Sequence, residues 1–185
     1  MKIWAISDLH LSFKQSPWSG EDWETMQYKP MSALDEKWQN HARQIYDNWQ
    51  KIVNKEDMVL MPGDISWAMR LPEAKYDFEF LGSLPGTIVA IAGNHDYWWQ
   101  SLKKSREAAP ANLQLLQNDF VRIGDLAVCG SRGWLCPNGV FFTEADQKIY
   151  KRELLRLENS LQMALKSSPQ DILVMIHYMP TNEKH

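Results

Sequence analysis

Four short groups of polar residues in this chain have side chains that hold metal ions and transfer protons. Carboxylates and imidazoles together suit Zn, Mn or Fe, and a single carboxylate can bridge two cations through its two oxygens. An Asn carbonyl oxygen ligates a metal without adding charge, and a neighbouring His can donate a proton. The residue types therefore indicate metal binding combined with acid–base chemistry. In chain order the groups are Asp8-Leu9-His10, Gly63-Asp64, Gly93-Asn94-His95-Asp96 and His177.

Taken singly, these groups differ in how specific they are. Asp8 with His10 also fits a helix cap beside an ordinary histidine, and Gly63-Asp64 fits a common turn. His177 alone also fits a structural histidine. The tetrapeptide 93–96 is the most specific, because four fixed residues of modest abundance seldom occur together by chance. Its aspartate can also orient the neighbouring imidazole and raise its pKa. The alternative for the tetrapeptide is a turn closed by an Asn-His-Asp hydrogen-bond network.

Short apolar runs precede all four groups and predict the strands that position them. Their lengths and their content of β-branched residues favour buried strands. In sheets flanked by helices, sites form in the crevice beyond the carboxyl ends of the strands. We therefore expect an α/β fold in which distant segments converge at one sheet edge. The runs are residues 2–6, 58–61, 87–92 and 172–176.

Helices and one hairpin are predicted between these strands. Apolar residues recur at spacings of three and four over residues 33–53, and residues 73–82 and a stretch ending near 108 are also expected to be helical. Thr143 with Asp146 resembles a capping box that begins a further helix. Gly124-Asp125 suits a type II′ turn between strands 120–123 and 126–129. The predicted apolar face of the last helix carries Tyr150, Leu154, Leu157, Leu161 and Leu165.

Composition sets the general class of the protein. The chain has 185 residues, 44% of them hydrophobic and 23% charged, with a formal net charge of -3, which predicts one soluble globular domain. The sequence pI of about 5.9 argues against a generic nucleic-acid surface. Cys129 and Cys136 fit no paired-cysteine zinc motif and are expected to be free thiols. With no predicted signal peptide or membrane span, we expect a cytoplasmic protein.

Taken jointly, the four groups resemble the calcineurin-like metallophosphoesterase family. The family pattern is Asp-x-His, Gly-Asp, Gly-Asn-His-Asp or -Glu, a His after a strand, and finally Gly-His-x-His. The first four parts occur here in that order between residues 8 and 177. The resemblance implies a four-layer α/β/β/α sandwich with mixed sheets and a dinuclear metal centre. It also implies hydrolysis of phosphate mono- or diesters by a hydroxide that two divalent metal ions activate. The metal ions would be Mn, Fe or Zn.

The resemblance also assigns a role to each residue of the four groups. It implies that Asp8 and His10 bind the first metal, that Asp64 bridges both metals, and that Asn94 and His177 bind the second. The same resemblance makes His95 the general acid or phosphate-oxygen donor and Asp96 its orienting partner. All seven positions match the family pattern in this sequence.

The final Gly-His-x-His motif of the family does not occur in this sequence, which ends at His185. In the family this motif gives each metal one further ligand, so we expect weaker metal binding and an incomplete second sheet. Glu183 and His185 are a weak substitute, because terminal residues are usually poorly ordered. The chain is therefore a part of a longer enzyme, a natural truncation, or a catalytically impaired or inactive binding module with the phosphoesterase fold.

Three further questions stay open at the level of the sequence. Residues 13–32, rich in tryptophan, are either an insertion that caps the active-site mouth or a loop packed on the neighbouring helix. The basic run fits a solvated helix face better than a nucleic-acid patch; it consists of Lys148, Lys151, Arg152 and Arg156. The substrate is a monoester, a diester or a phosphoprotein, with a small molecule or nucleotide preferred. An unrelated single-metal hydrolase is a further alternative.

Overall fold

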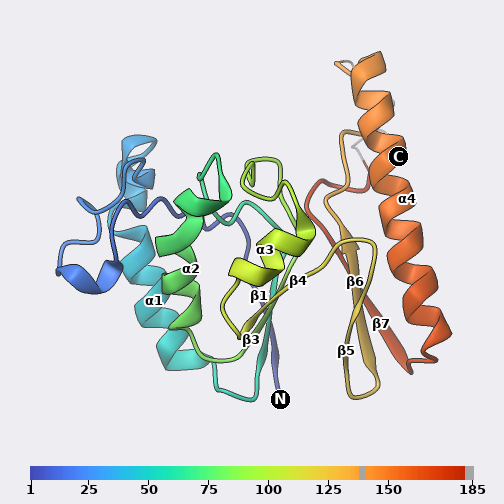
Figure 1. Ribbon diagram of the computed structural model, residues 1–185, viewed down its shortest axis with the longest axis horizontal. Helices are drawn as coiled ribbons and strands as arrows, with labels where there is room; N and C mark the ends of the chain where they lie inside the picture. Colours follow the sequence, from blue (N-terminus) through green and yellow to red (C-terminus); the bar gives the residue numbers. More distant parts are fainter. Residues whose placement is uncertain (138–140, 182–185) are drawn as a thin grey trace. The chain divides into compact units, whose positions relative to one another are not determined.

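The computed structural model describes residues 1–137 and 141–181, and the chain forms two compact units (Figure 1). The first unit comprises Met1–Ala90 and Asn94–Leu115. The second comprises Ile91–Gly93 and the chain from Leu116 onward. Each unit has its own sheet and its own group of buried apolar residues.

The sheet of the first unit is parallel, with the strand order β1-β2-β3-β4. Its strands are β1 (Ile3–Ala5), β2 (Met58–Met61), β3 (Thr87–Ala90) and β4 (Leu113–Leu115). The strands β2 and β3 lie in the middle and are almost wholly buried, as their continuous apolar runs predict. The prediction of burial is wrong for β1, where Ile3 is 43% exposed, because β1 is an edge strand.

The first helix is shorter than the periodicity predicts. The helix α1 (His41–Ile52) begins only after Asn40, whose left-handed φ of 55° interrupts the chain, so the predicted start at residue 33 is wrong. Two 3₁₀ turns, Met31–Ala33 and Glu36–Trp38, occupy the preceding segment. The apolar spacing of three and four is therefore not sufficient evidence for one continuous helix.

The other helices of this unit follow β2 and β3 along the chain. The prediction over residues 73–82 is confirmed by a 3₁₀ turn that continues into α2 (Lys75–Gly82). The helix α3 (Leu102–Ala108) ends where expected, but it does not begin directly after Asp96, because residues 97–101 are not helical.

Aromatic side chains fill the core of the first unit beside its helices. The ring of Trp23 lies 5.9 Å from that of Phe13 and 5.7 Å from that of Phe80, and its side chain is only 2% exposed. The indole of Trp49 on α1 is also buried. Part of segment 13–32 is therefore packed as core, as one of the two predicted alternatives requires.

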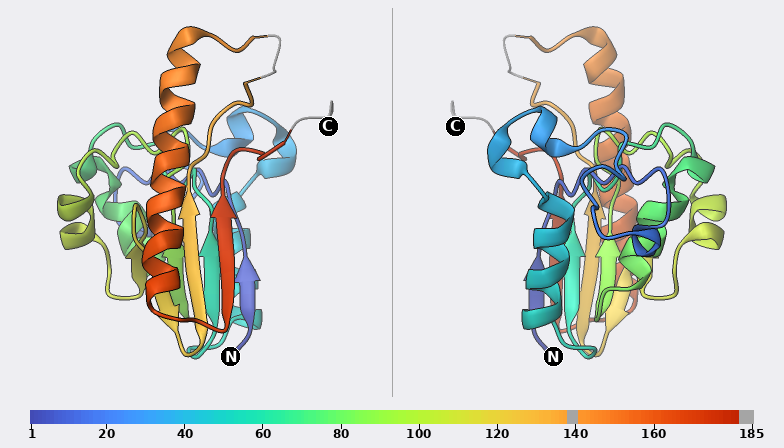
Figure 2. Two further views of the ribbon diagram at one scale, coloured as in Figure 1. Left: turned by 90° about the vertical axis from the view of Figure 1, so that its right-hand side faces the viewer. Right: turned by 90° about the vertical axis from the view of Figure 1, so that its left-hand side faces the viewer.

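The second unit contains a mixed sheet and one long helix. Its strands are β5 (Val121–Ile123), β6 (Leu126–Ser131) and β7 (Asp171–Ile176), in the order β5-β6-β7. The first pair is antiparallel, and Gly124 has the positive φ of 59° that a type II′ turn needs at its first position. The second pair is parallel, and α4 (Glu144–Lys166) connects its strands. Figure 2 shows α4 running along this sheet.

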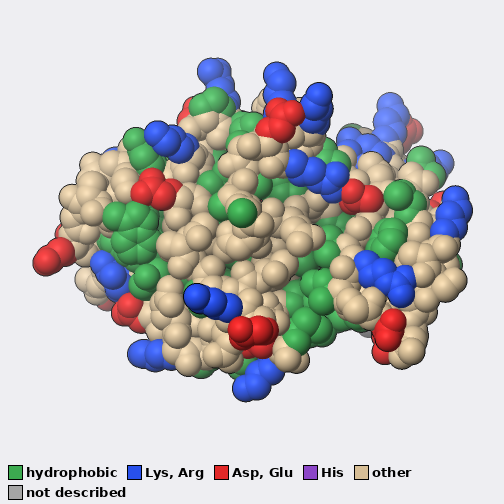
Figure 3. Space-filling model, turned by 60° about the horizontal axis from the view of Figure 1, so that its bottom comes forward, with side chains coloured by type: hydrophobic (Ala, Val, Ile, Leu, Met, Phe, Trp, Pro, Cys, Tyr) green, Lys and Arg blue, Asp and Glu red, His purple; other side chains and the backbone are tan. Residues whose placement is uncertain are grey.

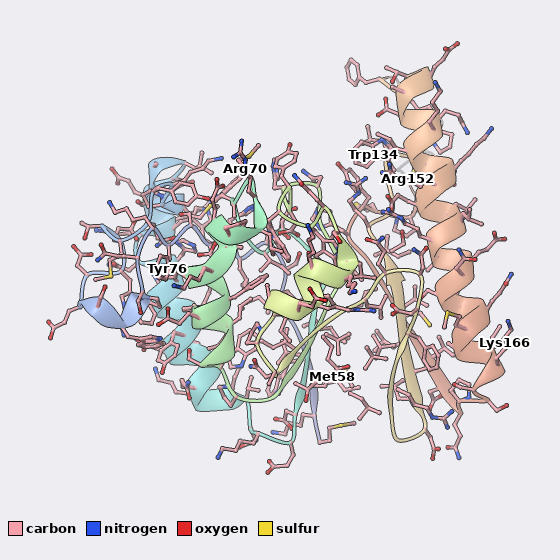
Figure 4. All side chains as sticks on the ribbon, viewed as in Figure 1. Met58, Arg70, Tyr76, Trp134, Arg152 and Lys166 are labelled. Carbon is pink, nitrogen blue, oxygen red and sulfur yellow. The ribbon has the colours of Figure 1, made fainter. Side chains whose placement is uncertain are left out.

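The helix α4 begins as predicted but buries a different face. Thr143 and Asp146 form the reciprocal capping box, and Lys166 lies in the last turn (Figure 4). Two residues of the predicted apolar face, Leu154 and Leu165, are 49% and 60% exposed. Small and polar residues face the sheet instead, because hydrogen bonds from β6 to α4 fix the helix there. The buried residues of α4 are Glu153, Ser160 and Ala164.

Arginines surround the buried carboxylate of α4. Glu153 pairs with Arg132 at 3.3 Å, Arg152 at 3.1 Å and Arg156 at 2.9 Å. Two of the basic residues of α4 are thus engaged by this carboxylate.

On the surface shown in Figure 3, basic and acidic side chains are interspersed. Among the helices of the described residues, none is both long and apolar enough to cross a bilayer.

The fold class is α/β, as predicted, with one parallel and one mixed sheet. Each unit combines a sheet with helical structure, and these are the kinds of layer that a four-layer sandwich requires. The strand β7 is more exposed than its apolar sequence predicts, with Val174 42% exposed, because it lies at the edge of its sheet. Cys129 and Cys136 are free thiols, as predicted.

Candidate metal centre

Three predicted metal ligands come together where β1 and β2 end. Potential ligand atoms of Asp8, His10 and Asp64 all lie within 4.8 Å of one another. The Nε2 atom of His10 lies 3.7 Å from a carboxylate oxygen of Asp8 and 3.7 Å from one of Asp64. All three residues belong to the first unit, so parallel strand pairing accounts for their convergence.

Backbone hydrogen bonds continue the β1–β2 alignment into the two ligand loops. The amide of Asp8 donates to the carbonyl of Gly63 at 3.1 Å, and that of His10 donates to the carbonyl of Asp64 at 3.0 Å. Asp8, His10 and Asp64 have positive φ values of 59°, 46° and 53°. The ligands therefore share a site through a left-handed backbone, and not through the alternation of side chains along an extended strand.

Burial differs among the three ligands. Asp64 is 3% exposed and His10 is 9% exposed, whereas the side chain of Asp8 is 55% exposed. Burial lowers the pKa of His10, although the carboxylates of Asp64 and Asp8 oppose this shift. A lowered pKa favours the neutral imidazole, which is the form that binds metals.

The ring of His10 is held by an aromatic neighbour that the sequence analysis missed. The indole of Trp67 stacks on the imidazole, with ring centroids 4.4 Å apart and an interplanar angle of 16°. The Nδ1 atom of His10 is buried and has no hydrogen-bond partner among the described residues. Ring stacking thus supplies an orienting contact where many metal-binding histidines use a hydrogen bond.

The Asn-His-Asp motif contacts the loop that carries Asp64. The backbone amide of His95 donates to Asp64 Oδ1 at 2.8 Å. The Oδ1 atom of buried Asp96 accepts hydrogen bonds from the amides of Ile65 at 2.9 Å and Ser66 at 3.1 Å. Asp96 therefore positions the Asp64 loop, and its predicted orienting effect on His95 stays a prediction.

The remaining predicted residues are distributed between the two units. Asn94 is half-buried in the first unit, next to His95, and its ligand role stays a prediction. His177 directly follows β7 in the second unit and is also half-buried. Its role as a ligand likewise stays a prediction. Glu183 and His185 lie outside the described residues.

A second missed residue fixes the loop between the first two ligands. His41, the first residue of α1, is 5% exposed, and its Nε2 atom lies 3.1 Å from the carbonyl oxygen of Leu9. This contact joins α1 to the residue between Asp8 and His10. Nothing in the local sequence around His41 distinguishes it from an ordinary helical histidine.

The ligand group consists of Asp8, His10 and Asp64, and a cavity of about 660 Å³ adjoins it in the first unit. Asp8 and His10 form part of the wall of this cavity. Trp4 of β1 and Ile45 and Trp49 of α1 contribute apolar surface. The ligand group is therefore next to a space large enough for a small organic molecule.

The donor set fits a divalent metal. Two carboxylates and one imidazole, with the imidazole nitrogen facing both carboxylates, suit Mn, Fe or Zn. Together with the parallel sheet whose strand ends carry these donors, they define an α/β protein with a candidate metal centre.

The chain belongs to the calcineurin-like phosphoesterase family, whose model matches residues 1–185. It is also similar to the crystal structure of a protein of unknown function, AQ665 from Aquifex aeolicus. The two are 15% identical, with a TM-score of 0.45, and the match covers 98% of this chain and 83% of that one. A search of curated proteins gave no significant match.

Proposed function

We propose that the protein is a metal-dependent phosphoesterase that hydrolyses small organic phosphate esters. The observation that carries this proposal is the convergence of Asp8, His10 and Asp64 in one ligand group. Membership of the phosphoesterase family supports the same reaction. Divalent metal ions, when bound, would supply an activated water and neutralise charge on the phosphoryl group.

The residues of the chain have distinct roles in this proposal. Asp8, His10 and Asp64 hold metal, and the family pattern makes Asn94 and His177 further candidate ligands. Asp96 keeps the Asp64 loop in place through the amides of residues 65 and 66. His95 donates a proton to the leaving oxygen.

The adjoining cavity supports a small-molecule substrate. Its volume of about 660 Å³ lies within the usual range for small-molecule sites. Apolar side chains such as Ile45 and Trp49 suit the organic part of an ester, while the phosphate lies at the ligand group. A nucleotide or another small organic phosphate fits this description.

The test combines metal binding with hydrolysis. We expect Mn²⁺ to bind and to stimulate release of nitrophenol from p-nitrophenyl phosphate, with both effects strongly reduced by Asp64→Asn. The matched control is Asp47→Asn, which changes an exposed carboxylate on α1 and should leave both unchanged. Absence of Mn²⁺ binding and of turnover in the folded wild-type protein would refute the proposal.

A further inference from the structure

Segment 13–32 returns to the metal centre after its aromatic core residues. The amide of Tyr28 donates to the carbonyl of Ser12 at 2.9 Å, and that of Lys29 donates to Ser12 Oγ at 3.2 Å. Ser12 is buried and lies two residues after His10. The backbone of Lys29 is therefore fixed close to the ligand loop.

The side chain of Lys29 lies over an aromatic ring of the site. Its Nζ atom is 3.0 Å from the centroid of the Trp67 ring. That ring stacks on His10 at 4.4 Å and lies 4.6 Å from the ring of His95. The ammonium group thus rests on a side chain that contacts both site histidines.

The positive charge of Lys29 is exposed beside the site. Among the described residues, no carboxylate forms an ion pair with its ammonium group. Lys37, by contrast, pairs with Asp35 at 2.9 Å. The charge of Lys29 is therefore available to an anionic ligand at the metal centre.

Building on the phosphoesterase activity proposed above, we propose that Lys29 makes the site selective for phosphate monoesters over diesters. A monoester dianion carries one more negative charge than a diester at neutral pH. A lysine ammonium at the edge of the site binds that additional charged oxygen. A diester has an organic group at the same position and gains less from the contact.

The test compares Lys29→Met with Lys29→Arg on two chromogenic esters. We expect Lys29→Met to lower kcat/KM for p-nitrophenyl phosphate by about 10- to 100-fold, with less than about threefold loss for bis(p-nitrophenyl) phosphate. Lys29→Arg should retain most of the preference. The control, Lys75→Met, changes an exposed lysine that lies 5.2 Å from the ring of Tyr76 and should leave the ratio unchanged.

A binding measurement separates this proposal from the activity itself. Inorganic phosphate should bind Lys29→Met about tenfold more weakly than wild type in calorimetry with Mn²⁺ present. If the wild type hydrolyses neither ester, the proposed activity fails, and phosphate affinity alone decides the role of Lys29. Equal losses for both esters, or unchanged phosphate affinity, would overturn the role of Lys29.

Discussion

Asp8, His10 and Asp64 all adopt left-handed backbone conformations, with φ values between 46° and 59°. Such conformations cost about 1 kcal/mol or more for a residue with a side chain and cluster at functional sites. The hydrogen bonds of the two ligand loops offset that cost. The sequence predicts these three residues as ligands from their types and order, but backbone torsions set by long-range contacts cannot be inferred from it.

Asp77 is a buried carboxyl group near the ligand loops. It is 0% exposed, and one oxygen accepts a hydrogen bond from the amide of Phe13 at 2.8 Å. Its other oxygen lies 2.5 Å from the hydroxyl of Ser66. Burial raises the pKa of Asp77 to about 7, with the charge of Asp96 adding to the shift and the two hydrogen bonds opposing it.

Asp77→Asn should flatten the pH dependence of stability. Because the folded pKa of about 7 exceeds the usual 3.8, the contribution of Asp77 is present at low pH and is lost as pH rises between these values. The stability of the variant relative to wild type should therefore rise with pH, by up to about 1.4 kcal/mol per pH unit. Urea unfolding from pH 5 to 8 measures this difference. Parallel profiles for the two proteins would contradict it.

At the scale of elements, the sequence predicts those strands and helices that a local pattern of apolar residues determines. Continuous apolar runs identify β2 and β3 because both are buried within a parallel sheet. The strand β4 is missed because three residues, Leu113–Leu115, give too short a pattern. The start of α1 is missed because Asn40 turns the chain, and the contacts of Lys29 with Trp67 are missed because these residues are distant in sequence.

The cavity beside α1 leads to a prediction about substrate size. Asn48 lines this cavity and is exposed, so Asn48→Trp should fill part of the space without disturbing the core. We expect kcat/KM for 1-naphthyl phosphate to fall about tenfold, with little change for glycerol 2-phosphate. Phosphate release measures both reactions.

The control for this substitution lies on the same helix. Asp47→Trp adds an equally large side chain at an exposed position that does not line the cavity. It should leave the ratio of the two substrates unchanged. Equal losses for both substrates in Asn48→Trp would show that the cavity does not hold the organic group.

At the scale of the whole molecule, the predicted ligands divide between the two units. Asp8, His10, Asp64 and Asn94 belong to the first, and His177 belongs to the second. A ligand that binds only the folded state stabilises it, by about 2.7 kcal/mol at a hundredfold excess over Kd. A metal ion held by Asp8, His10 and Asp64 would therefore reduce local opening in the first unit.

Hydrogen exchange with and without Mn²⁺ tests this division directly. We expect slower amide exchange over residues 6–11 and 62–66, because both loops carry ligands of the first unit. If His177 binds metal as predicted, Mn²⁺ should also slow amide exchange at the end of β7. The variant His177→Ala should lose only this slowing at the end of β7. Protection confined to residues 6–11 and 62–66 in the wild-type protein would instead favour a single-metal site, because the ligands of that site all come from the loops after β1 and β2.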